Sequence, residues 1–254
     1  MITSLQNEKV RLARALQSQA KIRRKEGKIA LEGVRLIRDA CERGNNPEYI
    51  LYTPGSANEQ LIADLQQQGM TLVAVSDEVM RHVSDTQQPQ AVVGVFPMPA
   101  PVLPVNPERV LIIDSIRDPG NMGTMLRTAA AAGVQAGLLS PDCADPYNPK
   151  TLRGGMGAHF RIPIAECSWQ DIAAYCDRLH IYLADSRGEI RYDEADWSAP
   201  WALIIGSEAH GAGDDAGHLA IARVYIPLAA ETESLNAAVA AGVILFEAQR
   251  QRNG

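Results

Sequence analysis

Five residues with charged or hydrogen-bonding side chains lie in three segments that each follow an apolar, strand-like run. The first segment passes through Pro119-Gly120 into a helix that is expected over residues 122–132. The five residues are Asn121 and Arg127 in the first segment, Glu208 in the second, and Ser234 and Asn236 in the third. Taken singly, Asn121 and Ser234 are reasonable helix N-caps, and Arg127 is a reasonable surface side chain. Only their joint occurrence favours a functional site.

The second segment joins a glycine-bearing loop to the end of an apolar run. Leu203-Ile-Ile-Gly206 ends a predicted strand, and Ser-Glu208-Ala-His-Gly211 follows it. Glycines permit close approach of the backbone, and open α/β sheets bind ligands beyond the carboxyl ends of their strands. The spacing is not G-x-G-x-x-G, so a dinucleotide-binding fingerprint is a poor match. We therefore expect a ligand loop of another kind.

The third segment leads from Ile226-Pro227 to Ser234-Leu235-Asn236 and then into a long helix. Alanine and valine occupy almost every face of this helix as far as Glu247. A helix that is apolar all round must be buried, either in a core or against another subunit.

The elements that must position these loops fall into two predicted domains. Residues 1–96 alternate between helices and strands, which predicts a small α/β domain. Residues 97–107 hold five prolines in eleven positions and are expected to form a semi-rigid linker. In residues 108–254 the strands are apolar runs, as in a parallel sheet buried on both faces, and a doubly wound α/β fold follows. These strands are expected at 109–114, 134–140, 180–185, 201–206 and 223–227.

Composition excludes several classes of protein. No stretch reaches the ~20 apolar residues of a membrane span, and the N-terminus lacks the apolar region of a secretory signal. The cysteines are scattered, and no His spacing suits a metal, so we expect a reduced cytoplasmic protein without disulfides or bound metal. The cysteines are Cys41, Cys143, Cys167 and Cys176, and the histidines considered are His159, His180 and His218. Asp114 and Asp118 could form a carboxylate pair, but Asp118-Pro119 is more simply explained as a turn.

Charge is unevenly distributed along the chain. The net charge is −6, yet residues 1–43 hold 11 Lys and Arg against 5 Asp and Glu. A basic arm on an acidic body is compatible with nucleic-acid binding through phosphates, and a solvated helix face explains it equally well.

Taken together, the three segments resemble the SpoU (TrmH-type) branch of the SPOUT RNA methyltransferases. The motifs occur in the family's order over residues 108–254, as residues 121–129 (NMGTMLRTA), 203–211 (LIIGSEAHG), and 226–227 with 234–236. Residues 156–163 resemble the family's G-A-x-F segment, whereas Gly154-Gly155 departs from the Ser or Ala of many relatives. The first domain resembles the family's L30e-like substrate-binding extension at Glu32-Gly33 and at residues 84–90.

The resemblance implies an S-adenosylmethionine-dependent enzyme that methylates a ribose 2′-hydroxyl of RNA. It implies a homodimer and a deep trefoil knot whose cofactor-binding crossings are the loops 206–213 and 226–234. S-adenosylmethionine would be held, largely through backbone groups, by Gly206, Ile226 and Leu235, with Leu203 and Gly211 nearby. The catalytic set would be Arg127, Asn121, Glu208, Ser234 and Asn236.

Arg127 takes the central role in the family, and some accounts make it the general base. A guanidinium group stays protonated in proteins, so it is a poor base. We instead expect Arg127 to clamp the phosphate beside the target ribose and to donate a hydrogen bond to the developing alkoxide. Asn121, Ser234 and Asn236 would orient Arg127 or the ribose, and Glu208 would fix the loop or the arginine.

Three other interpretations stay open at this point. The chain could act on transfer RNA, although relatives with this N-terminal extension favour ribosomal RNA. It could be a non-catalytic RNA-binding protein on the same scaffold, but the intact five-residue set argues against that. A Rossmann-type oxidoreductase would need a glycine fingerprint after an early strand, which is missing from this sequence.

Overall fold

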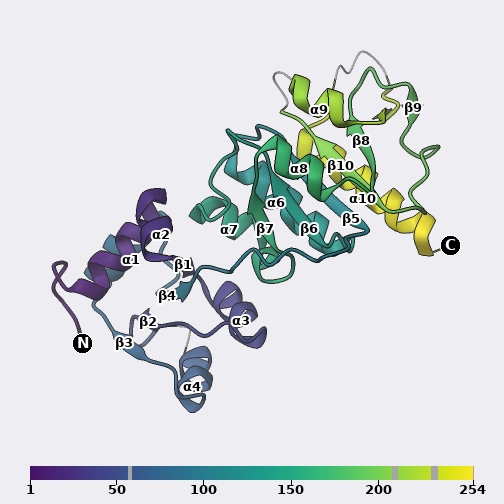
Figure 1. Cartoon of the computed structure of the whole chain (residues 1–254). Helices are drawn as coiled ribbons and strands as arrows, with labels where there is room; N and C mark the ends of the chain where they lie inside the picture. Colours follow the sequence, from purple (N-terminus) through teal and green to yellow (C-terminus); the bar gives the residue numbers. More distant parts are fainter. Residues whose placement is uncertain (57–58, 208–210, 230–233, 254) are drawn as a thin grey trace. The chain divides into compact units, whose positions relative to one another are not determined.

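The computed structural model describes residues 1–56, 59–207, 211–229 and 234–253, which form two compact units (Figure 1). The first unit comprises Met1–Pro99 and Tyr147–Phe160, and the second comprises Ala100–Pro146 and Arg161–Gly254. The predicted second domain, residues 108–254, therefore contributes one internal segment to the first unit.

The first unit is built on a four-stranded sheet of order β1-β4-β2-β3. The strands β1 and β2 both pair antiparallel with β4, and β3 pairs parallel with β2. The strands are β1 (Lys28–Glu32), β2 (Tyr49–Tyr52), β3 (Leu72–Ala74) and β4 (Val92–Pro97). The helices are α1 (Glu8–Ser18), α2 (Ala20–Glu26), α3 (Val34–Glu42), α4 (Glu59–Gln67), α5 (Asp77–Val83) and α7 (Pro149–Gly155).

Both faces of this sheet are covered, because successive strand residues point to opposite sides. Ala30 of β1 packs in a cluster with α1 and α5, whereas Ile29 and Leu31 pack in a second cluster with α3, α4 and α7. The unit thus has three layers, which agrees with the small α/β domain predicted from the sequence.

A buried carboxylate organises one loop of the first unit. Glu32 ends β1, is only 5% exposed, and accepts hydrogen bonds from the hydroxyls of Ser84 at 2.6 Å and Thr86 at 2.8 Å. It also accepts from the backbone N–H of Asp85 at 3.1 Å. The loop of residues 84–90 is therefore anchored on β1.

The segment 147–160 belongs to the first unit because its apolar side chains complete that unit's core. Tyr147 and Leu152 are buried in the cluster around α3 and α4. Arg153 adds an ion pair with Asp85 at 3.0 Å. The helix α7 ends at Met156, which adopts a left-handed conformation with φ 44°. The Gly154-Gly155 pair thus lies in the last turn of a helix and not in a loop.

The second unit contains a seven-stranded sheet of order β7-β6-β5-β10-β8-β11-β9, in which every neighbouring pair is parallel. The strands are β5 (Arg109–Ile113), β6 (Ala136–Leu139), β7 (Ile164–Glu166), β8 (His180–Ala184), β9 (Ile190–Arg191), β10 (Trp201–Ile205) and β11 (Ala222–Tyr225). Because sequence order is broken between β5, β10 and β8, the central strands come from distant parts of the chain.

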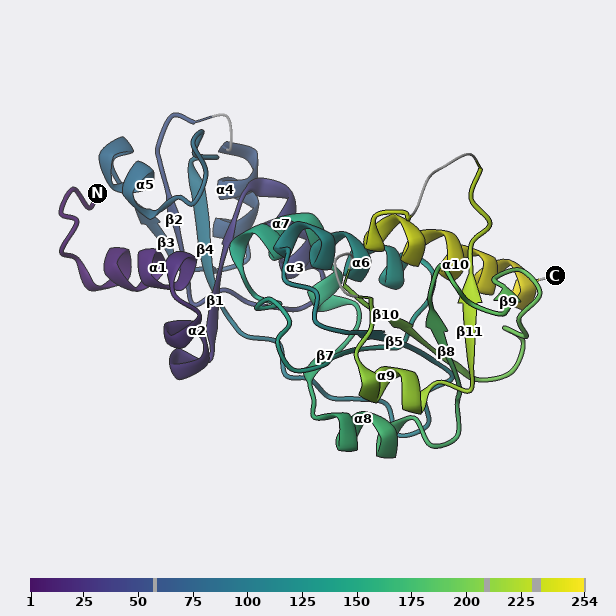
Figure 2. The ribbon, with the colours of Figure 1, turned by 90° about the horizontal axis from the view of Figure 1, so that it is seen from above.

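Helices cover both faces of the parallel sheet, with α8 and α9 on one side and α6 and α10 on the other (Figure 2). The α8 and α9 side is lined by residues such as Ile112, Leu183 and Ile204, which are at most 2% exposed. The helices are α6 (Pro119–Ala131), α8 (Trp169–Tyr175), α9 (Asp214–Leu219) and α10 (Ala237–Asn253). The predicted doubly wound α/β architecture is confirmed.

The start of α6 differs from the sequence-based expectation. The helix begins at Pro119, and its N-cap is Asp118, whose side chain accepts from the backbone N–H of Asn121 at 2.8 Å. The prediction of Asn121 as a helix cap is therefore wrong. The reason is that Asp118 with proline at the first helical position is a stronger start signal.

Candidate active site

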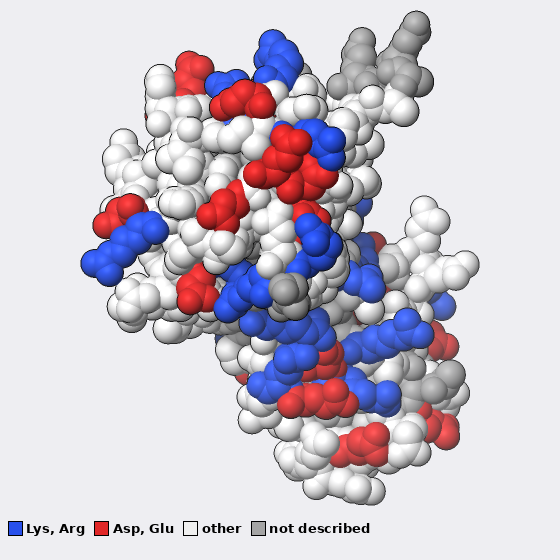
Figure 3. Space-filling view, turned by 90° about the vertical axis from the view of Figure 1, so that its right-hand side faces the viewer, with Lys and Arg blue, Asp and Glu red and all other residues white. Residues whose placement is uncertain are grey.

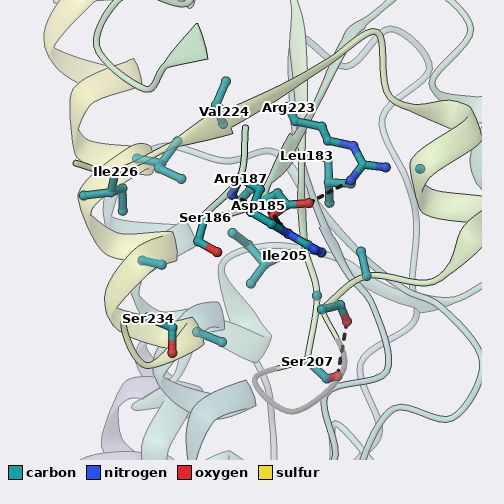
Figure 4. Close-up of a pocket in the computed structure, with 18 of the residues that line it drawn as sticks. Leu183, Asp185, Ser186, Arg187, Ile205, Ser207, Arg223, Val224, Ile226 and Ser234 are labelled. Carbon is teal, nitrogen blue, oxygen red and sulfur yellow. Dashed lines mark hydrogen bonds and ion pairs between the residues drawn. The ribbon is translucent and has the colours of Figure 1, made fainter. Parts of the chain in front are cut away.

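The site lies where the loops after β8, β10 and β11 leave the sheet at a common edge, since neighbouring strands are parallel. A cavity of about 770 Å³ opens there (Figure 4). Its apolar lining includes Ile205, Ile226, Leu228, Leu235 and Ile244. Its polar lining includes Asp185, Ser186, Arg187, Ser207, Arg223 and Ser234.

The loop after β10 approaches its own backbone so closely that only glycine fits at position 206. A Cβ on Gly206 would lie 2.4 Å from the backbone nitrogen of Ala212 and 2.5 Å from the carbonyl carbon of Gly211. Ser207 and Gly211 exchange two backbone hydrogen bonds of 2.9 Å, and Gly211 has φ 69°. Because Gly206, Gly211 and Ala212 all line the cavity, a ligand there meets main-chain groups.

Most of the predicted cofactor-contacting residues lie around this cavity. Gly206, Gly211, Ile226 and Leu235 line it, and Ser234 from the predicted catalytic set lines it as well. Leu203 does not: it is fully buried in the middle of β10. This correction has a simple cause, because a residue at mid-strand in a sheet covered on both faces packs into the core.

Two predicted catalytic residues from distant segments meet directly. The side-chain nitrogen of Asn236 donates to the side-chain oxygen of Asn121 at 3.1 Å. The side-chain oxygen of Asn236 accepts from the backbone N–H groups of Ala238 at 3.0 Å and Val239 at 3.3 Å. Asn236, and not Ser234, therefore caps α10, and it links the start of that helix to α6. Asn236 also stands between two cavity-lining neighbours, Leu235 and Ala237.

Arg127 projects from α6, six residues after Asn121, and its side chain is exposed. Within the described ranges, its guanidinium makes no hydrogen bond or ion pair with the protein. Its donors can thus serve an external anion. Glu208, the remaining member of the predicted catalytic set, lies outside the described residues.

The sequence reasoning missed the side of the cavity formed by the end of β8. Asp185 accepts from the guanidinium of Arg223 at 2.8 Å and from the backbone N–H of Arg187 at 2.9 Å (Figure 4). The signal that could have found it was the rule already applied to β10. Asp185 directly follows an apolar strand, and ligands bind beyond the carboxyl ends of strands in such sheets.

Three further observations concern a thiol, possible metal ligands and possible membrane spans. Burial raises the pKa of the Cys143 thiol near the end of β5, which disfavours the thiolate form. Among the residues that the structure describes, no group of three or more His, Cys, Asp or Glu side chains could hold a metal ion. In the same residues, no helix combines the length and apolarity needed to cross a bilayer.

The site and fold define a class of protein: a parallel α/β sheet with a glycine-containing loop beside two hydrogen-bonded asparagines, Asn121 and Asn236. The profile of the SpoU rRNA Methylase family matches residues 108–246, and that of the MRM3-like substrate binding domain matches residues 7–94. The chain belongs to the SpoU rRNA methylase family, and its fold is that of the SPOUT methyltransferases.

Named relatives match at least nine tenths of the chain. The 23S rRNA (guanosine(2553)-2′-O)-methyltransferase RlmP of Bacillus subtilis is 34% identical over 96% of this chain and 97% of its own length. The mitochondrial rRNA methyltransferase 3 of Mus musculus is 34% identical over 90% of this chain and 69% of its own length.

Solved structures of two methyltransferases are similar to this chain over almost its full length. The SpoU methyltransferase AviRb of Streptomyces viridochromogenes, in complex with the cofactor AdoMet, superposes with a TM-score of 0.90 at 27% identity. That match covers 98% of this chain and 99% of AviRb. The AdoMet-bound rRNA methyltransferase of Sinorhizobium meliloti superposes with a TM-score of 0.85 at 32% identity, over 98% of this chain and 97% of that one.

Proposed function

We propose that this protein transfers a methyl group from S-adenosylmethionine to a ribose 2′-hydroxyl of ribosomal RNA. The observation that carries the proposal is the cavity at the carboxyl edge of the sheet, which the second and third motif segments line beside the Asn121–Asn236 pair. The relatives support it, since RlmP is named as a 2′-O-methyltransferase of 23S rRNA and AviRb holds AdoMet.

The cavity fits S-adenosylmethionine in size and in lining. Its volume of about 770 Å³ lies within the usual range for small-molecule sites, roughly 300–1,000 Å³. Apolar side chains such as Ile226 and Leu235 suit the adenine ring, and main-chain groups at Gly206 suit its hydrogen-bonding edge. Asp185 and Ser234 suit the hydroxyl and amino groups of the ligand.

When bound, S-adenosylmethionine supplies an already activated methyl group on its sulfonium. The protein must therefore place the 2′-oxygen in line behind that methyl, and good orientation supplies roughly 7–11 kcal/mol of the barrier. The oxygen–methyl bond forms as the sulfur–methyl bond breaks, the electron pair stays on sulfur, and the 2′-hydroxyl proton must leave. Asn121 and Asn236 hold the hydrogen-bonding geometry of this corner of the site.

Arg127 acts in this proposal as a clamp and not as a base. Its exposed guanidinium binds the phosphate beside the target ribose through two parallel hydrogen bonds and donates to the oxygen as negative charge develops there. The flanking phosphate passes the departing proton to solvent. Glu208 keeps its proposed place in the site, fixing the loop or the arginine.

Ribosomal RNA is the proposed partner, and the first unit is its proposed binding domain. That unit carries the match to the MRM3-like substrate binding domain. Its residues 1–43 hold 11 Lys and Arg against 5 Asp and Glu, and Figure 3 shows Lys and Arg side chains exposed among Asp and Glu on the face that it draws. Such groups bind the RNA backbone through its phosphates.

We further propose that the chain is a homodimer with the family's trefoil knot, acting in the cytoplasm. The apolar side chains Val239 and Phe246 on α10 are 51% and 49% exposed, and two turns of helix separate them. Exposed apolar stripes of this kind mark interfaces. The knot crossings are assigned to loops 206–213 and 226–234, and the free thiols are compatible with a reducing compartment.

The function is tested in two steps. S-adenosylhomocysteine should raise the melting temperature of the purified protein and NAD should not, because only a bound ligand stabilises the native state. Mass-spectrometric mapping of RNA from cells lacking the protein should then show one lost 2′-O-methyl group in ribosomal RNA. Loss of a base methylation would overturn the reaction assignment. Loss of a ribose methylation in transfer RNA would overturn the substrate, and no loss with intact RNA binding would favour a non-catalytic protein.

A further inference from the structure

A second buried carboxylate, Asp114, lies at the end of β5 and belongs to no motif assigned above. It is 2% exposed, so its hydrogen bonds must be made within the protein. One carboxylate oxygen accepts from the hydroxyl of Ser140 at 2.7 Å and from that of Ser115 at 3.0 Å. The other accepts from the backbone N–H of Gly213 at 2.8 Å.

These three donors come from different parts of the sheet edge. Ser115 follows β5, Ser140 follows β6, and Gly213 ends the glycine loop that follows β10. The hydrogen bonds of Asp114 therefore connect the glycine loop after β10 to the ends of β5 and β6. These two strands lie on the opposite side of β10 from β8. Gly213 lines the cavity, whereas Asp114 itself does not.

The bond to Gly213 completes the attachment of the glycine loop. Gly206, at the start of the loop, packs closely against the backbone of Ala212. Two backbone hydrogen bonds join Ser207 to Gly211. The bond from Gly213 to Asp114 fixes the exit of the loop just before α9. Without it, the backbone from Gly211 to Gly213 is free to move away from the cavity.

We propose that Asp114 is a positioning residue, which holds the glycine loop in the geometry that binds S-adenosylmethionine. The same strand end leads into α6, which carries Asn121 and Arg127, so Asp114 joins the cofactor loop to the segment that handles the RNA. This inference rests on the proposed placement of the cofactor in the cavity. A charged acceptor suits the task because hydrogen bonds to ionised groups are the stronger ones.

The test compares cofactor affinity with stability. Asp114→Ala should raise the Kd for S-adenosylhomocysteine about tenfold or more, measured by calorimetry at a temperature where circular dichroism shows the variant folded. Asp114→Asn should recover most of the affinity, because its amide oxygen can accept from Gly213 while the hydroxyl of Ser140 accepts from its N–H. Ser140→Ala should keep the wild-type Kd, since the bond to Gly213 remains.

Glu32→Ala is the matched control, because it removes an equally buried carboxylate that holds a loop of the first unit. It should leave the Kd for S-adenosylhomocysteine unchanged. If Asp114→Ala does not fold, Asp114→Leu fills the same space without an acceptor and should show the same loss.

Each outcome decides between the proposals. A folded Asp114→Ala or Asp114→Leu protein with wild-type affinity and only a lower melting temperature would make Asp114 merely structural and overturn the inference alone. The same loss of affinity in Glu32→Ala would overturn it as well. Failure of the wild-type protein to bind S-adenosylhomocysteine would overturn both the inference and the proposed function.

Discussion

Asn121 shows that a polar residue near the start of a helix need not cap that helix. Its position near a helix start suggested a cap, but Asp118 takes that role. The side chain of Asn121 instead accepts a hydrogen bond from Asn236, 115 positions further on. Sequence patterns describe neighbours along the chain well. They do not reveal which of two polar residues three positions apart, Asp118 or Asn121, caps the helix.

The residues that line the cavity fall into two groups, those that a family motif contains and those that no motif contains. Family motifs identified Gly206, Ile226 and Leu235, which do line the cavity. Asp185 and Arg223 were missed because no motif contains them, although their ion pair forms part of the wall. Motifs thus locate loops that present backbone groups to a ligand better than they locate ion pairs between side chains from different strands.

Replacing Arg127 tests the clamp at the residue scale. Arg127→Lys keeps the positive charge but loses the planar fork, so kcat should fall about 10²-fold while the Kd for S-adenosylhomocysteine stays unchanged. Multiple-turnover methylation of the RNA substrate measures the first quantity and calorimetry the second. Arg178→Lys, an equally exposed arginine of the second unit, is the control. Near-normal turnover of Arg127→Lys would rule out the bidentate contact.

Replacing Gly206 gives a sharper test, because backbone atoms, which cannot rotate away as a side chain can, lie where a Cβ would be. In Gly206→Ala the new Cβ would lie 2.4 Å from the nitrogen of Ala212, so the loop must move and binding of S-adenosylhomocysteine should be lost. Gly213→Ala, in the same loop, is the control. Its Cβ would meet only the carboxylate of Asp114, at 3.7 Å, and its φ of −71° suits alanine. Calorimetric titration should show binding to the second variant only.

At the scale of elements, long apolar runs were predicted well and short segments were not. The five strands expected in the second domain all exist, with ends that differ by one or two residues. The helix α5 and the strands β7 and β9 were missed, because they span seven, three and two residues and show too little periodicity. The basic residues that follow residue 20 lie in the helix α2, which the extended residue Gln19 separates from α1.

The true cap of α6 gives a prediction at this scale. Asp118→Ala should lower the free energy of unfolding by about 1 kcal/mol, because the N–H of Asn121 loses its acceptor. Asn121→Ala should change it by less than about 0.5 kcal/mol, yet it should reduce turnover. Urea unfolding followed by circular dichroism measures the first effect, and a methylation assay measures the second. The reverse order of stabilities would restore Asn121 as the cap.

For the whole molecule, the architecture was predictable because two domains with different strand patterns flank a proline-rich stretch. The exchange of residues 147–160 between the units was not predictable, since Tyr147 and Leu152 follow a strand of the second unit without any break in composition. Only the shape of the first unit's core selects them. Long-range choices of this kind leave no periodic signal.

The proposed dimer is tested on the exposed stripe of α10. Phe246→Glu places a charge on a half-exposed apolar position and should convert dimers to monomers, because burying an unpaired carboxylate in an interface is unfavourable. Sedimentation velocity measures the mass of the particle. Val105→Glu changes an apolar residue that is 92% exposed outside this helix and should leave the mass unchanged. A wild-type protein that sediments as a monomer would contradict the proposal at once.

Because residues 147–160 are part of the first unit, they also determine when this unit can complete its folding during translation. Domains generally fold as units while the chain emerges from the ribosome, N-terminal parts first. Here Leu152 of α7, at 2% exposure, belongs to a core whose strands are complete by Pro97. The first unit must therefore wait, partly open, until the early strands of the second unit have already been translated. Any attempt to produce it as an isolated fragment, or to exchange it between relatives, has to carry residues 147–160 along.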